Sequence, residues 1–356
     1  MWIINILLLI LVLGILILAH EFGHFIAAKK NGVHIYEFAI GMGPILFQKK
    51  GKDEVLYSIR AFPIGGYCQM AGEVDEDDDK IAKDKFMCNK TALQKAIILL
   101  AGVVFNLILA IVLLFVSALI WGSKGLYPII GNLQADYPMA KAVSTSSDRY
   151  IEPGDKIIEI NGHKIGTWDK AQLILALKHS GSYKFVIKHT DGTTDKYEIT
   201  PKTEKQEDGS ERKVFGLQLD TTKQTGLISA FKYAFLKLGA VVNSMALVIA
   251  NLFTGKLSLN ALSGPVGIYG VIGQSAKEGV QYLIYIVAFL SINLAFVNVL
   301  PFPAFDGGRI LFLIIEKIKG SPVNAKVENM FHTIGFILLM ILMVYITFQD
   351  ILRLFR

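Results

Sequence analysis

Cysteine and charged residues are both scarce in this 356-residue sequence. The two cysteines, Cys68 and Cys88, form no CxxC pattern, so neither a disulfide framework nor a cysteine-based zinc site is indicated. Only 19% of the residues are charged, 53% are hydrophobic, and the mean hydropathy is +0.47. This balance excludes an ordinary soluble protein. We expect a membrane protein with a soluble insert.

A basic stripe with interleaved aromatic residues, as in nucleic-acid-binding proteins, is also missing. The net charge of +6 instead comes from Lys and Arg at the ends of apolar runs, where such residues set membrane orientation. We therefore expect no nucleic-acid partner. No Lys or Arg precedes the first apolar run and no small-residue cleavage site follows it, so we expect this run to remain as a helix and not to be removed as a signal peptide.

Four apolar runs are long enough to cross a hydrocarbon core of about 30 Å, which takes roughly 20 helical residues. They cover residues 2–28, 96–121, 282–300 and 330–348. Basic residues gather between the first and second runs and between the third and fourth, so these two segments are predicted to be cytoplasmic. The N-terminus, the long segment 122–278 and the C-terminus are then predicted to lie outside.

A fifth apolar segment, 238–253, is predicted not to span. It is only about 16 residues long, shorter than a span needs, and Asn243, Ser244 and Asn251 interrupt it. If it crossed the membrane, the next helix would be inverted and Asp306 would lie on the opposite side from His20. We interpret it as an amphipathic helix on the outer membrane surface.

Within the outer segment, residues 127–220 are predicted to form a small α+β domain. The stretches "DKIIEI", "YKFVIKH" and "DKYEITP" alternate between apolar and polar residues and are separated by Pro-Gly-Asp, Asn-Gly and Asp-Gly turns. "TWDKAQLILALK" has helical spacing. The acidic run at 73–80 is predicted to be a solvated loop, because adjacent carboxylates repel and no EF-hand pattern is present.

The first apolar run carries the sequence "HEFGH". His20 and His24 are four residues apart, so a helix places them on one face, within reach of a single metal ion. Glu21 can reach the open coordination position and take a proton from water, which is the chemistry of an HExxH motif. A chance match is the alternative, but a carboxylate and two imidazoles inside a membrane span are costly unless a cation neutralises them.

A catalytic zinc site needs a third protein ligand, and Asp306 in "NVLPFPAFDGGR" is the best candidate. The third run crosses in the same direction as the first and would deliver Asp306 to the depth of His24. Two prolines prevent regular helix before Asp306, and two glycines let the backbone fold tightly behind it. The alternative is an aspartate that caps a helix at the membrane boundary. The histidines expected to be non-catalytic are His34, His163, His179, His189 and His332.

Five ordered motifs resemble the bacterial site-2 protease family, the intramembrane zinc metalloproteases of the RseP/RasP type. The motifs are "AHEFGH", "YSIRAFPIGGY", "AGVVFN", "SGPVGI" and "NVLPFPAFDGG". The resemblance implies that His20, His24 and Asp306 bind zinc and that Glu21 is the general base. The expected fold is a polytopic α-helical membrane protein with four transmembrane helices, a membrane-associated β-hairpin and an inserted extracytoplasmic α+β PDZ-like domain.

The resemblance also implies substrate-binding residues. Asn293 and Asn298 match asparagines that bind the substrate backbone. Asn106 matches the asparagine of a GxxxN motif, for which helix packing from Gly102 is the alternative. A membrane-re-entrant hairpin would pair with the unwound substrate by β-augmentation. Its turns would be supplied by Gly41, Gly43, Gly65 and Gly66, and the last two are included among the substrate-binding candidates.

The expected organisation follows the chain in seven parts. They are a first transmembrane helix with HExxH (1–28), a cytoplasmic-side segment with the hairpin (29–95), a second transmembrane helix (96–121), a PDZ-like domain (127–220), an amphipathic membrane-surface region (226–278), a third transmembrane helix with the third zinc ligand (279–308) and a fourth transmembrane helix (330–350).

The predicted function is a zinc-dependent endopeptidase of the bacterial cell (inner) membrane that cuts transmembrane segments of single-pass proteins. Anti-sigma factors and remnant signal peptides both fit as substrates, with the lipid bilayer as the other partner and an upstream site-1-type protease making a first cut. A proteolytically inactive membrane scaffold, whose PDZ-like domain recruits partners, is the alternative from another class. Glu21 argues against the scaffold, because a structural metal site has no use for a base.

Overall fold

The computed structural model describes residues 2–73, 81–123, 125–177, 181–205, 211–220, 222–255, 257, 259, 262–321 and 323–354. The predicted acidic loop therefore lies, apart from its first residue, outside the described residues. The chain divides into two compact units. The helical unit comprises Met1–Leu113 and Asn260–Phe355, and the inserted unit comprises Leu114–Leu259.

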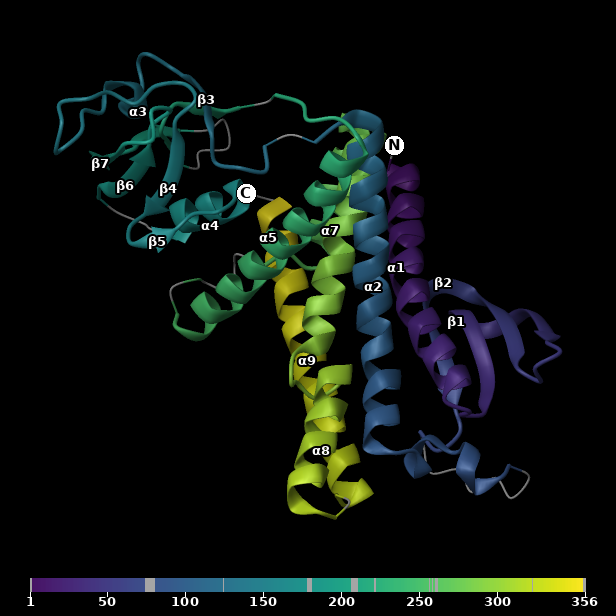
Figure 1. The fold of residues 1–356 in the computed structure, drawn as a ribbon. Coiled ribbons are helices and arrows are strands. Elements are labelled where there is room, and N and C mark those ends of the chain that lie inside the picture. The colour runs from purple at the N-terminus through teal and green to yellow at the C-terminus, as the bar shows by residue number, and fades with distance from the viewer. Residues whose placement is uncertain are drawn as a thin grey trace. The chain divides into compact units, whose positions relative to one another are not determined.

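Long helices build the helical unit (Figure 1). They are α1 (Trp2–Lys30), α2 (Ala92–Trp121, whose last residues belong to the inserted unit), α6 (Pro265–Glu278), α7 (Val280–Val299), α8 (Asp306–Lys319) and α9 (Ala325–Leu354). Two short 3₁₀ helices, η1 (Lys83–Lys85) and η2 (Met87–Asn89), precede α2. Three of the predicted spans correspond to α1, α2 and α7, and the fourth lies inside the longer α9.

Helix α2 begins four residues before its predicted start because a capping box precedes it. The Thr91 backbone N–H donates to Gln94 Oε1 at 3.1 Å, and the Gln94 N–H donates to the Thr91 hydroxyl at 3.3 Å. Helix α1 ends at Lys30. Gly32, two residues later, has a φ of 66°, a conformation that glycine readily adopts after a helix. Helix α2 therefore begins before its apolar run, and helix α1 ends after its apolar run.

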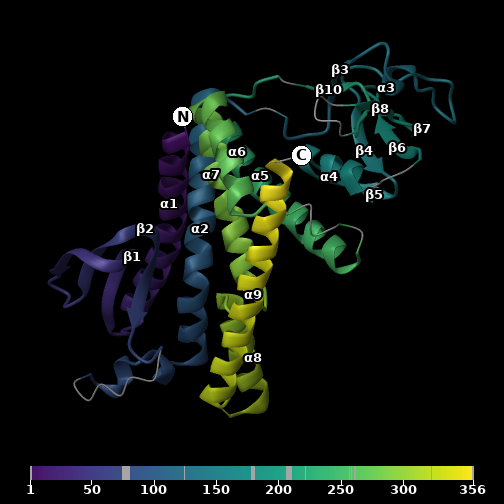
Figure 2. The same cartoon turned by 180° about the vertical axis from the view of Figure 1, so that it is seen from behind.

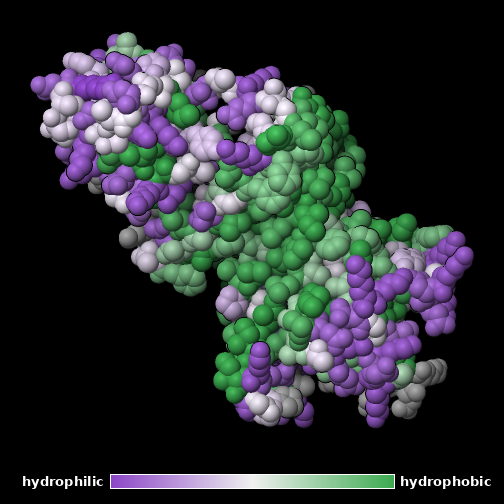
Figure 3. Space-filling model, viewed as in Figure 1, coloured by the Kyte–Doolittle hydropathy of each residue, from purple (hydrophilic) through white to green (hydrophobic). Residues whose placement is uncertain are grey.

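Exposed apolar side chains cover the outer faces of the long helices, which are green in Figure 3, whereas the surface of the α+β domain is mostly purple. Examples on α9 include Ile337, Leu338 and Ile341, each more than half exposed. Exposed apolar surface on this scale is unfavourable in water and is typical of contact with lipid. Together with the length of the helices, it makes this a multi-pass membrane protein.

Among the described residues, five helices, one more than predicted, are long and apolar enough to cross a membrane. The additional one is α5 (Leu227–Phe253), which has 27 residues. The predicted length of about 16 residues was wrong, because the helix begins at Leu227 and includes Lys232 and Lys237. Lys237 is tolerated there because its Nζ lies 2.7 Å and 2.9 Å from the Asp169 carboxylate oxygens in the inserted unit.

Helices α1, α6 and α7 share a buried apolar cluster, with α9 alongside as Figure 2 shows. Val12 and Leu16 of α1 meet Ile272 of α6 and Val287 of α7, and all four side chains are buried. Gly273 lies against Asn5, so α6 packs on the N-terminal half of α1. At the other end of α6, the buried Asp350 of α9 accepts the backbone N–H groups of Gly264 and Gly267 at 2.8 Å each.

Strands β1 (Ile35–Lys50) and β2 (Leu56–Met70) pair antiparallel beside α1 (Figure 1). The chain reverses between them near Gly51, whose N–H donates to the Val55 carbonyl at 2.8 Å. The four glycines predicted to supply turns lie within the bounds of β1 and β2, at the middle of each long strand. Gly41, Gly43 and Gly65 have positive φ and fall where the register shifts. The stretch 56–59 pairs antiparallel with 47–50 and also runs parallel to 37–40, so the hairpin folds back on itself at these glycines, as the predicted turns require.

The inserted unit contains the predicted small α+β domain. Its four-stranded sheet has the order β5-β4-β6-β7, formed by β4 (Lys156–Ile160), β5 (His163–Lys164), β6 (Tyr183–Lys188) and β7 (Thr194–Ile199). Two further pairs are β3 (Ile130–Leu133) with β10 (Leu217–Leu219) and β8 (Lys202–Lys205) with β9 (Glu211–Val214). The helices are α3 (Pro138–Lys141), α4 (Trp168–Leu177) and α5.

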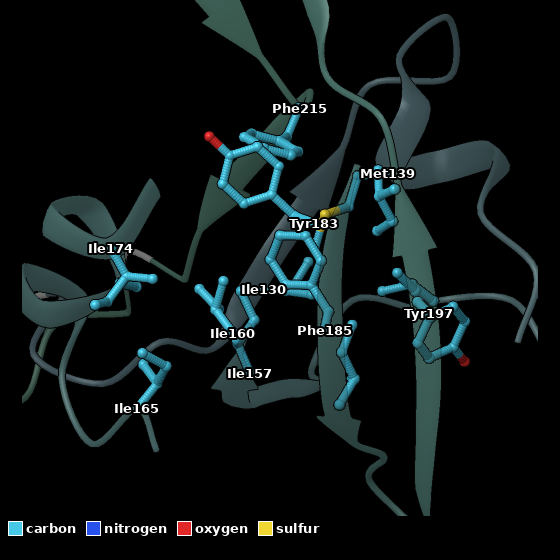
Figure 4. Packing of buried hydrophobic residues seen from close by; sticks show 14 residues of the cluster. Ile130, Met139, Ile157, Ile160, Ile165, Ile174, Tyr183, Phe185, Tyr197 and Phe215 are labelled. Carbon is cyan, nitrogen blue, oxygen red and sulfur yellow. The ribbon is translucent and has the colours of Figure 1, made fainter. Parts of the chain in front are cut away.

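Alternating apolar residues form the core of this domain, as the predicted strands require. Tyr183 and Phe185 of β6 lie together in the core (Figure 4). Both are fully buried, as are Ile187 of β6 and Tyr197 of β7. Phe215 packs on two of them, with ring centroids 5.2 Å from Tyr183 and 5.7 Å from Phe185. The strands and helix predicted between 155 and 201 are confirmed wherever the structure describes them.

The turn of the β1–β2 hairpin is predicted to detach from α1 at low pH. Lys29 and Tyr57 donate to Asp53 at 2.6 Å and 2.8 Å and lower the pKa of its carboxyl to about 2. A lowered pKa means that the interaction is complete above the ordinary carboxyl pKa of about 3.9 and is lost as the pH falls toward 2. Hydrogen-exchange protection of residues 51–57 in detergent-solubilised protein should fall between about pH 4 and 2.

The matched variant is Asp53→Asn, which removes the charge and keeps the shape. Its protection in the turn should already be reduced at neutral pH and should not change further between about pH 4 and 2. An unchanged acid dependence in this variant would show that another group controls the turn.

Candidate metal centre

Helix α1 presents His20 and His24 on one face, as their spacing predicts. Their Nε2 atoms lie 3.1 Å apart, and both residues are buried, with 8% and 6% of their surface exposed. The rings meet edge to face with centroids 4.7 Å apart. Two nitrogen lone pairs therefore converge on one point next to the helix.

Asp306 comes to this point from the start of α8. Helix α7 ends at Val299, a non-helical segment with Pro301 and Pro303 follows, and α8 begins at Asp306 itself. Asp306, the third candidate ligand, thus begins a separate helix. The prediction that it lies at the end of the third span was wrong. Behind it the chain folds tightly: a Cβ on Gly308 would lie 2.5 Å from the Phe302 carbonyl oxygen, so only glycine fits there.

The three side chains converge as a metal site requires. Asp306 Oδ2 lies 3.1 Å from His20 Nε2 and 3.4 Å from His24 Nε2, and it is buried without a well-aligned hydrogen bond. Ligands about 2.0–2.1 Å from a tetrahedral zinc ion are about 3.3–3.4 Å apart, which is close to these three separations. Two imidazoles and one carboxylate also match the donor set of catalytic zinc sites, so the residues fit the ion.

The other ring nitrogens of both histidines face α2. His24 Nδ1 donates a hydrogen bond to the Ile98 carbonyl oxygen at 2.8 Å, and His20 Nδ1 lies 3.4 Å from the Asn106 amide. Gly102 lies between these two positions in the sequence. The three residues are spaced by four and share one face of α2.

Glycines allow α1 and α2 to approach this closely. A Cβ on Gly23 of α1 would overlap the Ala101 carbonyl, and a Cβ on Gly102 of α2 would lie 2.5 Å from His24 Nε2. A larger residue at either position would separate the helices or displace the imidazoles.

Glu21 lies with the three candidate ligands in the wall of a cavity of about 520 Å³. Cys68 and Met70 of β2 line the same cavity, so the second half of this strand forms part of its wall. Gly66 of β2 also comes close to Glu21, because a Cβ there would be 3.9 Å from Glu21 Cγ. The arrangement can hold an extended chain between a carboxylate, a strand and a metal ion.

Of the asparagines predicted to bind substrate, only Asn298 lines this cavity. Asn293 lies five residues before Asn298 on α7, and its side-chain oxygen is buried without a hydrogen-bond partner. Asn106 is fully buried against His20. Gly65 contacts Met42 of β1, and Gly66 faces Glu21.

Sequence reasoning missed two charged residues and a histidine of the cavity wall. Arg309 of α8 pairs with Glu73, which follows β2, and both line the cavity. His332, which was expected to be outside the site, reaches it from α9. Its Nδ1 accepts the Ala304 N–H at 3.3 Å and so supports the segment before Asp306. Arg309 lies three residues after Asp306, which could have indicated it, but no local pattern pointed to Glu73 or His332.

Long apolar helices, an HExxH motif and a carboxylate as the third candidate ligand define the class of this protein as a membrane-embedded metallopeptidase. Comparison with known proteins agrees. The family model described as peptidase family M50 matches residues 8–342. The chain belongs to this family.

Relatives across bacteria are similar over almost the whole chain. A protein of Clostridium acetobutylicum named as a zinc metalloprotease is 37% identical over 348 residues, which is 98% of this chain and 97% of the relative. The zinc metalloprotease RasP of Bacillus licheniformis is 31% identical over 97% of this chain and 98% of its own length. The regulator of sigma-W protease RasP of Bacillus subtilis is 32% identical over the same shares.

These findings confirm the predicted family, the zinc cofactor and the protease activity. The protein is an intramembrane zinc metalloprotease. The alternative of an inactive membrane scaffold is therefore not retained.

Adding a methyl group at Gly102 is predicted to disrupt the metal centre. In Gly102→Ala the new Cβ would lie 2.5 Å from His24 Nε2 and 2.7 Å from His20 Cε1. Overpacking of this kind costs about 1–3 kcal/mol, so zinc affinity should fall roughly 10- to 100-fold. Zinc content after dialysis against a graded series of chelator concentrations measures the change.

Gly270→Ala on α6 is the matched control, because it is also helical and nothing lies within 4 Å of the added Cβ. It should keep the parental zinc affinity. Equal affinities in the two variants would mean that α2 moves aside without disturbing the histidines.

Proposed function

We propose that His20, His24 and Asp306 hold the catalytic zinc ion and that Glu21 is the general base. The observation that supports this assignment is the convergence of Asp306 Oδ2 on both Nε2 atoms at 3.1 and 3.4 Å, although about 280 residues separate it from them. Glu21 follows His20 directly, so it shares the cavity without competing for the same position.

A zinc ion held by His20, His24 and Asp306 would supply Lewis acidity, which polarises a carbonyl and lowers the pKa of water. The Glu21 carboxylate accepts the proton of the attacking water and later gives it to the leaving amine. The buried imidazoles stay oriented through their Nδ1 atoms, with the hydrogen bond from His24 to the Ile98 carbonyl the clearest example. Base catalysis of this kind contributes roughly 10²- to 10⁴-fold in rate.

We infer that the substrate lies as an extended strand beside the second half of β2. Cys68 and Met70 line the cavity there, and Gly66, whose missing Cβ lets β2 lie close to the Ala39 carbonyl of β1, begins this half of the strand. A transmembrane helix must unwind before cleavage, and its freed amide groups then need partners. Pairing with a strand supplies backbone partners, and Asn298, which lines the cavity, supplies an amide.

The hairpin itself is proposed to be membrane-associated, because its strands expose large apolar side chains. Met42, Ile45, Leu46, Phe47 and Phe62 are each close to half exposed or more. Such a surface next to the active cavity suits contact with lipid, where a transmembrane substrate would approach.

The proposed substrates are transmembrane segments of single-pass membrane proteins. A relative named as a regulator of sigma-W protease supports an anti-sigma factor as one substrate. Remnant signal peptides fit equally well, because pairing through the backbone reads little sequence. A first cut by a site-1-type protease outside the membrane would prepare either class.

We propose four membrane spans, α1, α2, α7 and α9, with α5 outside the hydrocarbon core. Two points on α5 are held by the inserted α+β domain: Lys237 pairs with Asp169 of α4, and Leu247 packs on the domain core. A polar domain cannot follow a helix into hydrocarbon. The exposed Ile228, Phe231 and Phe235 would then rest on the membrane surface.

Packing within the helical unit is a second argument that the chain crosses the membrane an even number of times between α2 and α7. The chain leaves this unit near the N-terminal half of α1, because Leu109 and Leu113 of α2 pack on the buried cluster that contains Val12 and Leu16. It returns in α6, where Gly273 lies against Asn5, near the same end of α1. Helix α6 is about 21 Å long, too short to cross alone, so a single crossing by α5 would leave the chain on the wrong side.

We propose that the inserted α+β domain is PDZ-like and extracytoplasmic, together with both termini, and that it excludes substrates with intact outer domains. Its four-stranded antiparallel sheet, with helix α4 packed on the core, is compatible with that assignment. The cytoplasmic location of 29–95 and of the segment between α7 and α9 rests on their basic residues.

Replacing Glu21 by Gln is predicted to abolish proteolysis while zinc remains bound. The amide cannot accept the proton of water, so cleavage of a purified model transmembrane substrate should fall at least about 100-fold. Glu278→Gln, at the exposed end of α6, is the matched control and should cleave at the parental rate. Unchanged cleavage by Glu21→Gln would overturn the proposed role of Glu21.

The proposed topology predicts which side of the membrane the end of α5 faces. In a background of Cys68→Ala and Cys88→Ser, a cysteine in place of the exposed Thr254 should react with an impermeant maleimide added to cells whose outer surface is accessible. A cysteine in place of Lys319 should react only after permeabilisation. Reaction of the Thr254→Cys variant only after permeabilisation would make α5 a fifth span.

A further inference from the structure

The Asn106 side chain lies between the metal centre and the helix that supports it. Its Nδ2 is 3.4 Å from His20 Nδ1, its Oδ1 is buried without a hydrogen-bond partner, and none of the residue is exposed. The two ends of an amide are nearly equal in shape, so rotation of the amide by 180° exchanges them without repacking. In that orientation the unpartnered oxygen faces His20 Nδ1.

The chemistry of a bound imidazole selects this orientation. His20 directs Nε2 toward Asp306 and His24, so a neutral His20 that binds zinc through Nε2 carries its proton on Nδ1. A buried N–H without an acceptor is costly. His24 meets the same requirement with the Ile98 carbonyl, and the Asn106 amide is the side chain that faces His20 Nδ1.

We propose that Asn106 is a positioning residue for the zinc site: its side-chain oxygen accepts the Nδ1 proton of His20 and thereby fixes both the ring orientation and the proton position that zinc binding requires. The proposal rests on His20 being a zinc ligand, as proposed above. It assigns Asn106 to the metal centre and not to the substrate, which the resemblance had suggested.

The surroundings of Asn106 support this role over plain helix packing. Ser291 of α7 donates to the Asn106 backbone carbonyl at 2.8 Å and is fully buried, which joins α2 to α7 at this residue. One face of α2 then serves both histidines. The Ile98 carbonyl accepts a hydrogen bond from His24, Gly102 leaves room for the two rings, and Asn106 offers an acceptor to His20. Packing alone would be served by an apolar residue and would not leave a buried amide beside an imidazole.

The test compares two variants of nearly the same shape in the detergent-solubilised full chain. Asn106→Asp keeps an acceptor and should bind zinc at least as tightly as the parent. Asn106→Leu removes the acceptor and should bind zinc roughly 10- to 100-fold more weakly, as is usual when the partner of a ligating histidine is lost. Chelator competition gives the zinc affinity, and the visible spectrum of the cobalt(II)-loaded protein reports the ligand geometry without any activity measurement.

Ser291→Ala is the matched control, because it removes a buried hydrogen bond to the same residue but leaves the amide in place. It should keep the parental zinc affinity and cobalt spectrum. The unfolding temperature of the zinc-free proteins separates the two roles: Asn106→Leu should unfold near the parental temperature, and only its zinc-induced stabilisation should shrink. If Asn106→Leu does not fold, Asn106→Ala replaces it in the comparison with Asn106→Asp.

Parental zinc affinity in Asn106→Leu, or equal losses in the Leu and Asp variants, would overturn the proposal. His20→Ala distinguishes this failure from a failure of the ligand assignment. If His20→Ala loses zinc while Asn106→Leu keeps it, His20 remains a ligand and only the role of Asn106 is wrong. If His20→Ala keeps its full zinc content, the ligand assignment is wrong and the role of Asn106 falls with it.

Discussion

The contact between the backbones of α1 and α2 is the constraint on which the metal centre depends. Gly23 lies between Glu21 and His24 in the HExxH motif and faces the Ala101 carbonyl, and Gly102 lies directly against both imidazoles. This absence of side chains brings a carbonyl and an amide of α2 within reach of the Nδ1 atoms. The histidines are thus held from behind by a helix, which is the arrangement expected of a rigid site.

Asp306 completes the site through a different device. It begins a helix after a segment that cannot be helical, and Gly307 and Gly308 let this segment lie directly on the start of α8. His332 supports the same segment from α9 by accepting the Ala304 N–H. Asp306 is far in the sequence from His20 and His24, so the geometry of a single helix cannot place it beside them. The non-helical segment before α8 and its contacts position it instead.

Membrane topology connects these two parts. Asp306 can reach His20 and His24 only if the chain between α2 and α7 leaves and returns on the same side of the helical unit. The packing of Gly273 against Asn5 and of Ile272 against Val12 is consistent with that return. The pairing of Lys237 with Asp169 explains how α5, apolar and long enough to span, can instead remain with the inserted α+β domain.

Sequence alone determined those features that depend on local spacing. The i, i+4 histidines, the adjacent Glu21, the prolines before Asp306 and the alternation in β6 each follow from the geometry of a single element, and each was predicted correctly. The motifs also identified the family and its zinc dependence. Only the tertiary structure decided what depends on contacts between elements: the true length of α5, the pairing of 56–59 with two other stretches of the hairpin, the presence of His332 and Glu73 in the cavity wall, and the burial of Asn106 against His20. The reason is physical, since a side chain's partner across two helices is set by how closely their backbones approach, and no periodicity within either helix records that distance.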